Sequence, residues 1–320
     1  MHILYIYLYT VYAHKIITYI VLEFFIQTEV QGSDYMIKIE HLTKQFDNFK
    51  FALSDISFSI PKGYICGLIG ENGAGKSTLI HTILGLYRAD RGDIYINGHD
   101  IAIDEIATKN DIGYVLSDEL FDPYMTLINN ADSYGKYYIN YNRNLFIEYC
   151  KRFELNIKSK LQSLSKGEKL KFQFAFALAH SPKLLLLDEP TANFDPRFRN
   201  EFFEILTNFI SDGEHSILLA THLTSDLEII ADYITFIHKG QLLLSTDRET
   251  LLNSYRLIQG EAYKLNSIKK SNLIHSDIKD KHMVALVKHH SYDTYDKELT
   301  VSIPTIEDIM YHYIKEDSHV

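Results

Sequence analysis

The 320-residue sequence has no tryptophan, six prolines and only two cysteines. Two cysteines, Cys66 and Cys150, are too few for a disulfide framework, which predicts a protein of the reducing cytoplasm. Basic residues are also outnumbered by acidic ones, and the formal net charge is −10. Because nucleic acids are bound largely through Lys and Arg that neutralise phosphates, this charge argues against a nucleic-acid partner.

No apolar run is long enough for a membrane span, although two runs near the start come closest. Ile3–Ala13 and Ile16–Ile26 are each shorter than the ~20 residues of a membrane span, and joining them would bury Lys15. The peptide Gln31–Asp34 can be encoded as a ribosome-binding site just before Met36. We therefore interpret residues 1–35 as an extension from a mis-called start, with a weak membrane-surface segment as the alternative.

After Met36, short apolar runs alternate with segments of helical periodicity. Leu184–Leu187 and Ile217–Ala220 are continuous apolar runs, as expected of strands buried on both faces of a parallel sheet. Residues 118–160 are polar and aromatic, with helical character. Strands that alternate with helices predict a doubly wound α/β core.

The composition changes near Thr246. This residue and Glu249 have the spacing of a capping box, which predicts the start of a helix. We expect residues 246–320 to form a small C-terminal α+β accessory domain.

A glycine-rich segment carries the strongest chemical signal. It follows an apolar strand, precedes a helix and matches the P-loop pattern: Gly70, Glu71, Asn72, Gly73, Ala74, Gly75, Lys76 and Ser77. Its backbone N–H groups and the helix N-terminus favour phosphate binding. We expect Lys76 to reach the β- and γ-phosphates of a nucleotide and Ser77 to bind Mg²⁺. An incidental glycine-rich turn is the alternative, and the loop alone does not separate kinases, GTPases and motors.

Two adjacent acids end the apolar run Leu184–Leu187. Carboxylates at the end of a buried strand are costly unless they are paired or bind a metal. Asp188 is therefore a candidate Mg²⁺ ligand, and Glu189 is placed to polarise an attacking water. The alternative is a solvated strand end before Pro190.

Two further signals gain meaning from their order. A Ser165-Lys166-Gly167-Glu168 helix start is by itself typical of a cap. Its place before the acidic strand favours a second anion site, made by the Ser165 hydroxyl, the Gly167 N–H and the helix N-terminus. His222 follows the next apolar strand, at the edge of the sheet where such sites form, although a histidine there is more often structural.

Taken in this order, the motifs resemble the nucleotide-binding subunit of ABC transporters over residues 37–245. The resemblance implies a P-loop NTPase (RecA-like) core within an ATPase domain at 36–245, with an antiparallel β subdomain and a helical signature subdomain at about 118–180. It assigns Gly70–Thr78 to ATP binding, Ser165–Glu168 to the signature loop that acts in trans, Asp195 to the D-loop, and Glu189 and His222 to catalysis. Phe46 takes the place of the aromatic that stacks on adenine, with Phe49 and Phe51 as rivals.

The resemblance also implies cofactors and partners. Two such domains, from the same or a related chain, enclose two ATP molecules with Mg²⁺ and act on a separately encoded transmembrane permease. The chain is then expected at the cytoplasmic face of the membrane, held there through the permease.

Three departures from the family pattern stand out. Ser117 occupies the position of the usual Q-loop glutamine, while Lys166 and Glu168 replace a glycine and a glutamine of the signature loop. The lysine-containing signature loop and the tail Ser302–Met310 look like the ABC-2 exporter branch. That branch includes exporters of bacitracin-type antibiotics and of amphipathic peptides such as phenol-soluble modulins.

The rival interpretation is a soluble ABC ATPase acting on a ribosome or another macromolecule. Ribosome-acting members usually carry two ATPase domains in one chain, whereas this sequence contains one. DNA-acting members carry a long coiled coil between the motifs, and no heptad run separates Lys76 from Asp188. Both observations favour the exporter motor.

Overall fold

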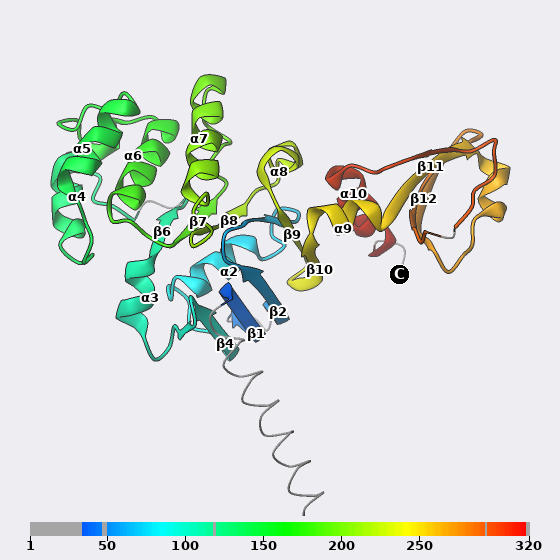
Figure 1. Ribbon diagram of the computed structural model, residues 1–320, viewed down its shortest axis with the longest axis horizontal. Helices are drawn as coiled ribbons and strands as arrows, with labels where there is room; N and C mark the ends of the chain where they lie inside the picture. Colours follow the sequence, from blue (N-terminus) through cyan, green and yellow to red (C-terminus); the bar gives the residue numbers. More distant parts are fainter. Residues whose placement is uncertain (1–33, 47–49, 118–119, 292, 318–320) are drawn as a thin grey trace, which may run out of the picture.

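The computed structural model describes residues 34–46, 50–117, 120–291 and 293–317. Figure 1 shows a central sheet with helices on its faces, a second sheet against it, and a separate C-terminal sheet. The interpretation of residues 1–35 falls almost entirely outside the described residues.

The central sheet has six strands in the order β10-β9-β3-β8-β7-β6. Neighbours from β9 to β6 pair in parallel, and β10 joins the edge in antiparallel fashion. Its strands are β3 (Ile65–Ile69), β6 (Ile112–Val115), β7 (Leu184–Asp188), β8 (Ser216–Ala220), β9 (Tyr233–His238) and β10 (Gln241–Asp247).

The apolar run of β7 explains why this sheet forms. All of its residues are buried, and successive side chains enter two different cores. Leu185 and Leu187 pack into one hydrophobic cluster, whereas Leu184 and Leu186 pack into the other. Because neighbouring side chains of a strand point to opposite faces, a run without polar residues requires a covered sheet. The predicted α/β core is confirmed.

An antiparallel sheet covers one of these faces. Its order is β2-β1-β4-β5, with β1 (Tyr35–Phe46), β2 (Lys50–Pro61), β4 (Arg91–Ile96) and β5 (His99–Asp100). The core between the two sheets also takes apolar side chains from α2 (Lys76–Ile83). This sheet is the predicted antiparallel subdomain.

Helices cover the opposite face and extend beyond it (Figure 1). They are α4 (Leu127–Gly135), α5 (Arg143–Arg152), α6 (Lys166–Ala179), α7 (Pro196–Phe209) and α8 (Thr224–Ile230). Helix α3 (Glu105–Asp111) lies on the side of the antiparallel sheet instead, where it contacts β5 and β6. Aromatic rings fill the space among α4, α5 and α6, with Phe121 edge-on to both Phe172 and Phe176. The aromatic residues of this segment therefore pack these helices into one helical subdomain.

The C-terminal part forms the α+β module predicted from the sequence. Its antiparallel sheet has the order β12-β13-β11-β14 and its own small core. The elements are α9 (Arg248–Asn253), β11 (Tyr255–Glu261), β12 (Leu273–Lys279), β13 (His282–Lys288), β14 (Thr300–Ser302) and α10 (Ile306–Asp317). The prediction that Thr246 caps the first helix was wrong by one residue, because the next side chain makes the capping hydrogen bond. Asp247 is the N-cap and accepts the Thr250 N–H at 2.7 Å.

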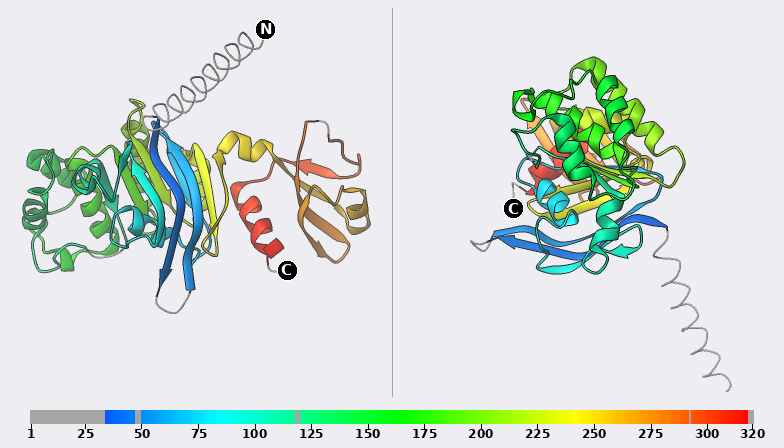
Figure 2. Two further views of the ribbon diagram at one scale, coloured as in Figure 1. Left: turned by 90° about the horizontal axis from the view of Figure 1, so that it is seen from below. Right: turned by 90° about the vertical axis from the view of Figure 1, so that its left-hand side faces the viewer.

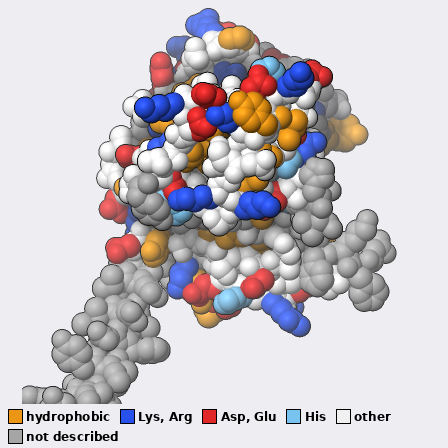
Figure 3. Space-filling model, turned by 90° about the vertical axis from the view of Figure 1, so that its right-hand side faces the viewer, with side chains coloured by type: hydrophobic (Ala, Val, Ile, Leu, Met, Phe, Trp, Pro, Cys, Tyr) orange, Lys and Arg blue, Asp and Glu red, His pale blue; other side chains and the backbone are white. Residues whose placement is uncertain are grey.

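Helix α10 joins this module to the ATPase core. In Figure 2 it lies between the C-terminal sheet and the rest of the chain. The Tyr313 hydroxyl is 2.7 Å from that of Tyr255, and the Ile306 N–H donates to Oε1 of Glu228 at 3.0 Å. The outer face of the module mixes acidic and basic side chains (Figure 3). Within the described part of the chain, no helix combines the length and the apolarity needed to cross a membrane.

Candidate functional site

The glycine-rich loop lies between β3 and α2, as predicted. Gly70 and Gly75 have φ angles of 155° and 111°. A Cβ atom on Gly70 would lie 2.2 Å from the Ile237 carbonyl oxygen, and one on Gly75 would lie 2.6 Å from that of Ala52. Both positions therefore require glycine, since the obstacle is backbone that cannot rotate away. The loop is held in a tight curve at the N-terminus of α2.

Lys76 is folded back into this loop. Its Nζ donates to the carbonyl oxygens of Gly70 at 2.7 Å and Glu71 at 3.2 Å, and the residue is only 6% exposed. Burial lowers the pKa of Lys76, against the opposing influence of the nearby carboxylates Glu189 and Asp188. The ammonium is thus a desolvated cation at the centre of the loop, where an anion would be attracted strongly.

Asp188 ends β7 beside the loop. Burial raises its pKa, while a hydrogen bond from Ser77 lowers it. Its buried Oδ1 atom has no hydrogen-bond partner among the described residues. An orphaned carboxylate oxygen is costly, and a cation next to a hydroxyl group would remove that cost. Ser77 and Asp188 therefore fit the hard oxygen ligands that Mg²⁺ prefers.

Glu189 and His222 lie together at the ends of neighbouring strands. His222 Nδ1 is 2.8 Å from Glu189 Oε2, and the Thr221 hydroxyl is 3.4 Å from the same oxygen. Glu189 has a φ of 51°, and its N–H donates to the Ala220 carbonyl at 2.9 Å. A positive φ in a non-glycine residue is a strained backbone. The strained residue is thus Glu189 itself, whose carboxylate faces the glycine-rich loop.

These groups surround a cavity of about 190 Å³. Its lining comes from the loop and the start of α2, from the acid that follows β7, and from β2: Ala52, Asn72, Gly73, Gly75, Lys76, Ser77, Thr78 and Glu189. Ala52 was missed by the sequence analysis, because a small residue on a strand carries no chemical signal. The structure thus brings the two predicted motifs into one pocket.

Phe46 does not line this cavity. Its ring is 43% exposed and edge-on to Tyr87 at 5.2 Å, and the Tyr87 ring in turn contacts His81 of α2. The side chains of Phe49 and Phe51 lie outside the described residues. The prediction that Phe46 stacks on adenine stays a prediction.

The signature segment forms the start of α6. Ser165 Oγ accepts the Glu168 N–H at 3.2 Å, and the Glu168 carboxylate accepts the Ser165 N–H at 2.8 Å. This reciprocal capping box explains why Glu168 is tolerated in place of glutamine. A Cβ atom on Gly167 would lie 2.5 Å from the Asn193 carbonyl oxygen. Neither Ser165 nor its three successors line the cavity around Lys76.

Asp195 and Ser117 occupy positions next to these elements. Asp195 caps α7 by accepting the Phe198 N–H at 2.9 Å, and Lys171 lies 3.6 Å from its other oxygen. The Ser117 hydroxyl is 3.4 Å from the Asp188 carbonyl oxygen. The Q-loop position is therefore adjacent to Asp188, the candidate Mg²⁺ ligand. Asp118 and Glu119 lie outside the described residues.

Two residues with structural roles at the site had no sequence signal. The side-chain amide of Gln173 is buried. It accepts the Leu116 N–H at 2.9 Å and donates to the Leu116 carbonyl oxygen at 3.0 Å. It fixes the chain just before Ser117. His238, at the end of β9, lies 3.7 Å from Glu71 of the glycine-rich loop. Both contacts link elements that are remote in the sequence.

Comparison with known proteins identifies the family. A family profile described as ABC transporter matches residues 53–192, which contain the loop, the signature segment and the acid pair. The chain is 32% identical to the linearmycin resistance ATP-binding protein LnrL of Bacillus subtilis (strain 168) over 214 residues, covering 65% of this chain and 68% of LnrL. The chain belongs to the ABC transporter ATP-binding family. It is an ABC-type ATP hydrolase that binds ATP.

Other relatives of this ABC ATPase agree with the assignment. The lantibiotic transport ATP-binding protein SrtF of Streptococcus pyogenes is 30% identical, with 71% of this chain and 97% of SrtF covered. A solved ATP-binding subunit of an ABC transporter superposes with a TM-score of 0.62 at 26% identity, covering 68% of this chain and 91% of that subunit. The fold class predicted from the sequence is confirmed.

Proposed function

We propose that this ABC ATPase powers a separately encoded membrane permease, and that its cargo is an antimicrobial or amphipathic peptide. The proposal for the catalytic part rests on one observation: Lys76, Ser77 and Glu189 line one pocket, Asp188 hydrogen-bonds to Ser77 beside it, and His222 contacts Glu189. Positioned charge is what phosphoryl transfer requires.

Each group has a distinct proposed role. Lys76 would exchange its hydrogen bonds to the loop carbonyls for stronger, charge-assisted bonds to the β- and γ-phosphates. Ser77 and Asp188 would hold Mg²⁺, which neutralises phosphate charge when bound. Glu189 would orient and polarise the attacking water, and His222 would contact the γ-phosphate through Nε2 while Nδ1 faces Glu189.

The signature segment is proposed to complete the site of a second subunit. Ser165 and Gly167 start a helix whose N-terminus attracts anions, yet they do not line their own chain's cavity. A sandwich of two ATPase domains would place this helix start against the partner's nucleotide. The second subunit is either the same chain or a related one.

An exposed apolar surface supports the permease as partner. Ile106 of α3 is 78% exposed, and Ile139 and Tyr137, which follow α4, are 81% and 71% exposed. Asn110 lies one helical turn after Ile106 and accepts the Ile139 N–H at 2.8 Å, so the two segments adjoin. Apolar side chains grouped on a surface mark an interaction site. A helix or loop on the cytoplasmic side of a permease would cover it.

The names of relatives support the cargo. LnrL is a linearmycin resistance protein and SrtF a lantibiotic transport protein. The test uses a strain lacking this gene, complemented with wild type, with Ile106→Asp plus Ile139→Asp, or with the matched control Ile278→Asp, whose side chain is 54% exposed on the C-terminal module.

We expect wild type and control to restore peptide resistance and membrane recovery of the protein. The purified double variant should hydrolyse ATP like wild type. In cells it should neither restore peptide resistance nor be recovered with the membrane. Unchanged resistance in the double variant would reject this docking surface. A wild-type protein found on ribosomes, without any membrane fraction, would reject the exporter proposal.

A further inference from the structure

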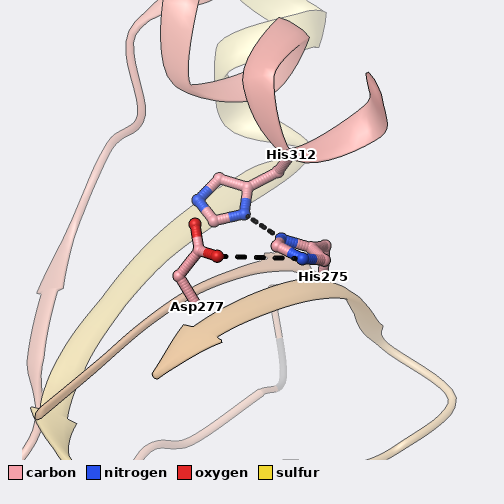
Figure 4. Close-up of side chains that lie close together, drawn as sticks. All are labelled: His275, Asp277 and His312. Atoms are coloured by element: carbon pink, nitrogen blue, oxygen red, sulfur yellow. Dashed lines mark hydrogen bonds and ion pairs between the residues drawn. The ribbon is translucent and has the colours of Figure 1, made fainter. Parts of the chain in front are cut away.

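A cluster of metal-binding side chains lies in the C-terminal module, far from the ATP motifs in the sequence. His275 and Asp277 stand two residues apart on β12 and thus on the same face of that strand. His312 comes from α10, which packs against β12. Figure 4 shows the three side chains turned toward one another.

The distances fit one shared ion. His275 Nδ1 is 3.0 Å from His312 Nδ1, and His275 Nε2 is 4.0 Å from an oxygen of Asp277. One ligand-type atom of each residue lies within 4.8 Å of the other two. Zinc binds nitrogen at about 2.0–2.1 Å, so two nitrogens on one tetrahedral ion lie about 3.3 Å apart. The contacts to His312 and Asp277 use different nitrogens of His275, so a shared ion would take one of them and the side chains would rotate to reach it.

The surroundings hold these side chains in place. His275 and His312 are 8% and 2% exposed. The Tyr311 side chain hydrogen-bonds to Asp277 and so restricts the carboxylate. Buried imidazoles and an oriented carboxylate suit a transition-metal site.

We propose that His275, Asp277 and His312 form a site for a divalent transition-metal ion, with zinc as the best match. Two imidazoles and one carboxylate suit zinc, and water supplies the fourth ligand. The ion would join β12 to α10. The competing description is a pair of neutral histidines that share one hydrogen bond.

Zinc binding to the full-length, untagged protein tests the proposal. Equilibrium dialysis followed by metal analysis should find about one high-affinity zinc ion per chain. His312→Gln, His275→Gln and Asp277→Asn should each weaken binding by about 100-fold or more, since even second-shell changes cost 10–100-fold. The matched control is His282→Gln on β13, whose side chain is 75% exposed and which should bind like wild type.

Cobalt substitution provides an independent readout. Co²⁺ in the wild-type protein should give the intense visible absorption of tetrahedral coordination, and the ligand variants should lose it. ATP turnover and circular dichroism check that each variant is folded, and the half-exposed Asp277 allows a mild change if the histidine variants fail. Wild-type protein without tight zinc, or equal affinity in Asp277→Asn and wild type, would overturn the proposal and leave the hydrogen-bonded pair.

Discussion

His222 Nδ1 lies 2.8 Å from Glu189 Oε2, although 33 residues separate the two in the sequence. The contact exists because β7 and β8 are parallel neighbours and both residues follow the carboxyl ends of these strands. An Nδ1–H donated to a carboxylate leaves Nε2 of the same ring available as an acceptor or, when protonated, as a donor. The contact therefore orients the imidazole ring beside Glu189, which lines the cavity.

Replacing Glu189 with Gln should stop ATP turnover while ATP still binds. The change removes the proposed base but leaves Lys76, Ser77 and Asp188 in place. General-base catalysis contributes roughly 10²–10⁴-fold, so steady-state hydrolysis should fall by at least about 100-fold. Equilibrium binding of a fluorescent ATP analogue should stay near wild type. Glu204→Gln on the exposed side of α7 is the matched control, and near-normal hydrolysis by Glu189→Gln would remove this residue from the mechanism.

Changing His222 should reduce turnover without unfolding the protein. Loss of one preorganised phosphate contact typically costs about 10²-fold, and His222→Ala should lose this much. His222→Gln keeps a donor and should retain more. The control is His41→Ala, whose side chain is 81% exposed and lies beside Asp55. If the control and the His222 variants lose equal activity, the effect is not specific to the site.

Asp188→Asn should make the nucleotide-free protein more stable and at the same time inactive. Burial raises the pKa of Asp188, so its stabilising effect on folding is complete below the unfolded-state pKa and disappears as pH rises through the folded-state value. At neutral pH the buried charge is therefore a cost, which Asn removes.

The thermal midpoint of Asp188→Asn should exceed that of wild type at pH 7, with a difference that shrinks toward pH 4. Turnover should drop by at least about 100-fold. A variant less stable than wild type at pH 7 would contradict this electrostatic account. Added Mg²⁺–ATP should raise the midpoint of wild type more than that of the variant.

Gly167→Ala should disturb the signature segment. The new methyl group would lie 2.5 Å from the Asn193 carbonyl oxygen, and two backbone segments must then separate. Overpacking of this kind costs about 1–3 kcal/mol, measurable by denaturant unfolding, and ATP hydrolysis should fall. Lys166→Ala, one residue earlier and exposed, should leave stability unchanged. Equal stability of Gly167→Ala and wild type would show that the segment adapts freely.

Mixing two inactive variants tests the sandwich. Lys76→Ala and Ser165→Arg should each be inactive alone. If the chain forms homodimers in which both groups serve one ATP from opposite subunits, a mixed dimer has one site with both defects and one intact site. The mixture should then hydrolyse ATP faster than either variant. A mixture no faster than its components, together with a Glu189→Gln protein that stays monomeric with ATP and the permease, would reject the sandwich.

Local signals in the sequence were sufficient for the core strands and for most of the pocket. The run Leu184–Leu187 has no polar position, and such a strand needs cover on both faces. The capping-box spacing of Ser165 and Glu168 likewise has a local cause. The start of α9 was misplaced by one residue, because Thr246 and Asp247 are adjacent and both are favoured N-cap types.

Tertiary contacts account for what the sequence did not reveal. Ala52 reaches the pocket because β2 passes over the glycine-rich loop, and Gln173 is significant only through its contact with Leu116. His275 and His312 are 37 residues apart and meet because α10 packs on β12. Pairings of this kind depend on how elements dock, which no short-range pattern encodes.

The bond between the Ile306 N–H and Glu228 has a mechanical consequence. Glu228 lies on α8, which begins two residues after His222, so α8 forms a short arm between the histidine and the last helix. Any rotation of that arm during the ATP cycle must either swing α10 with it or break this bond. If α10 moves with α8, the distance between two spin labels, one on α10 and one on α6, should change during ATP hydrolysis.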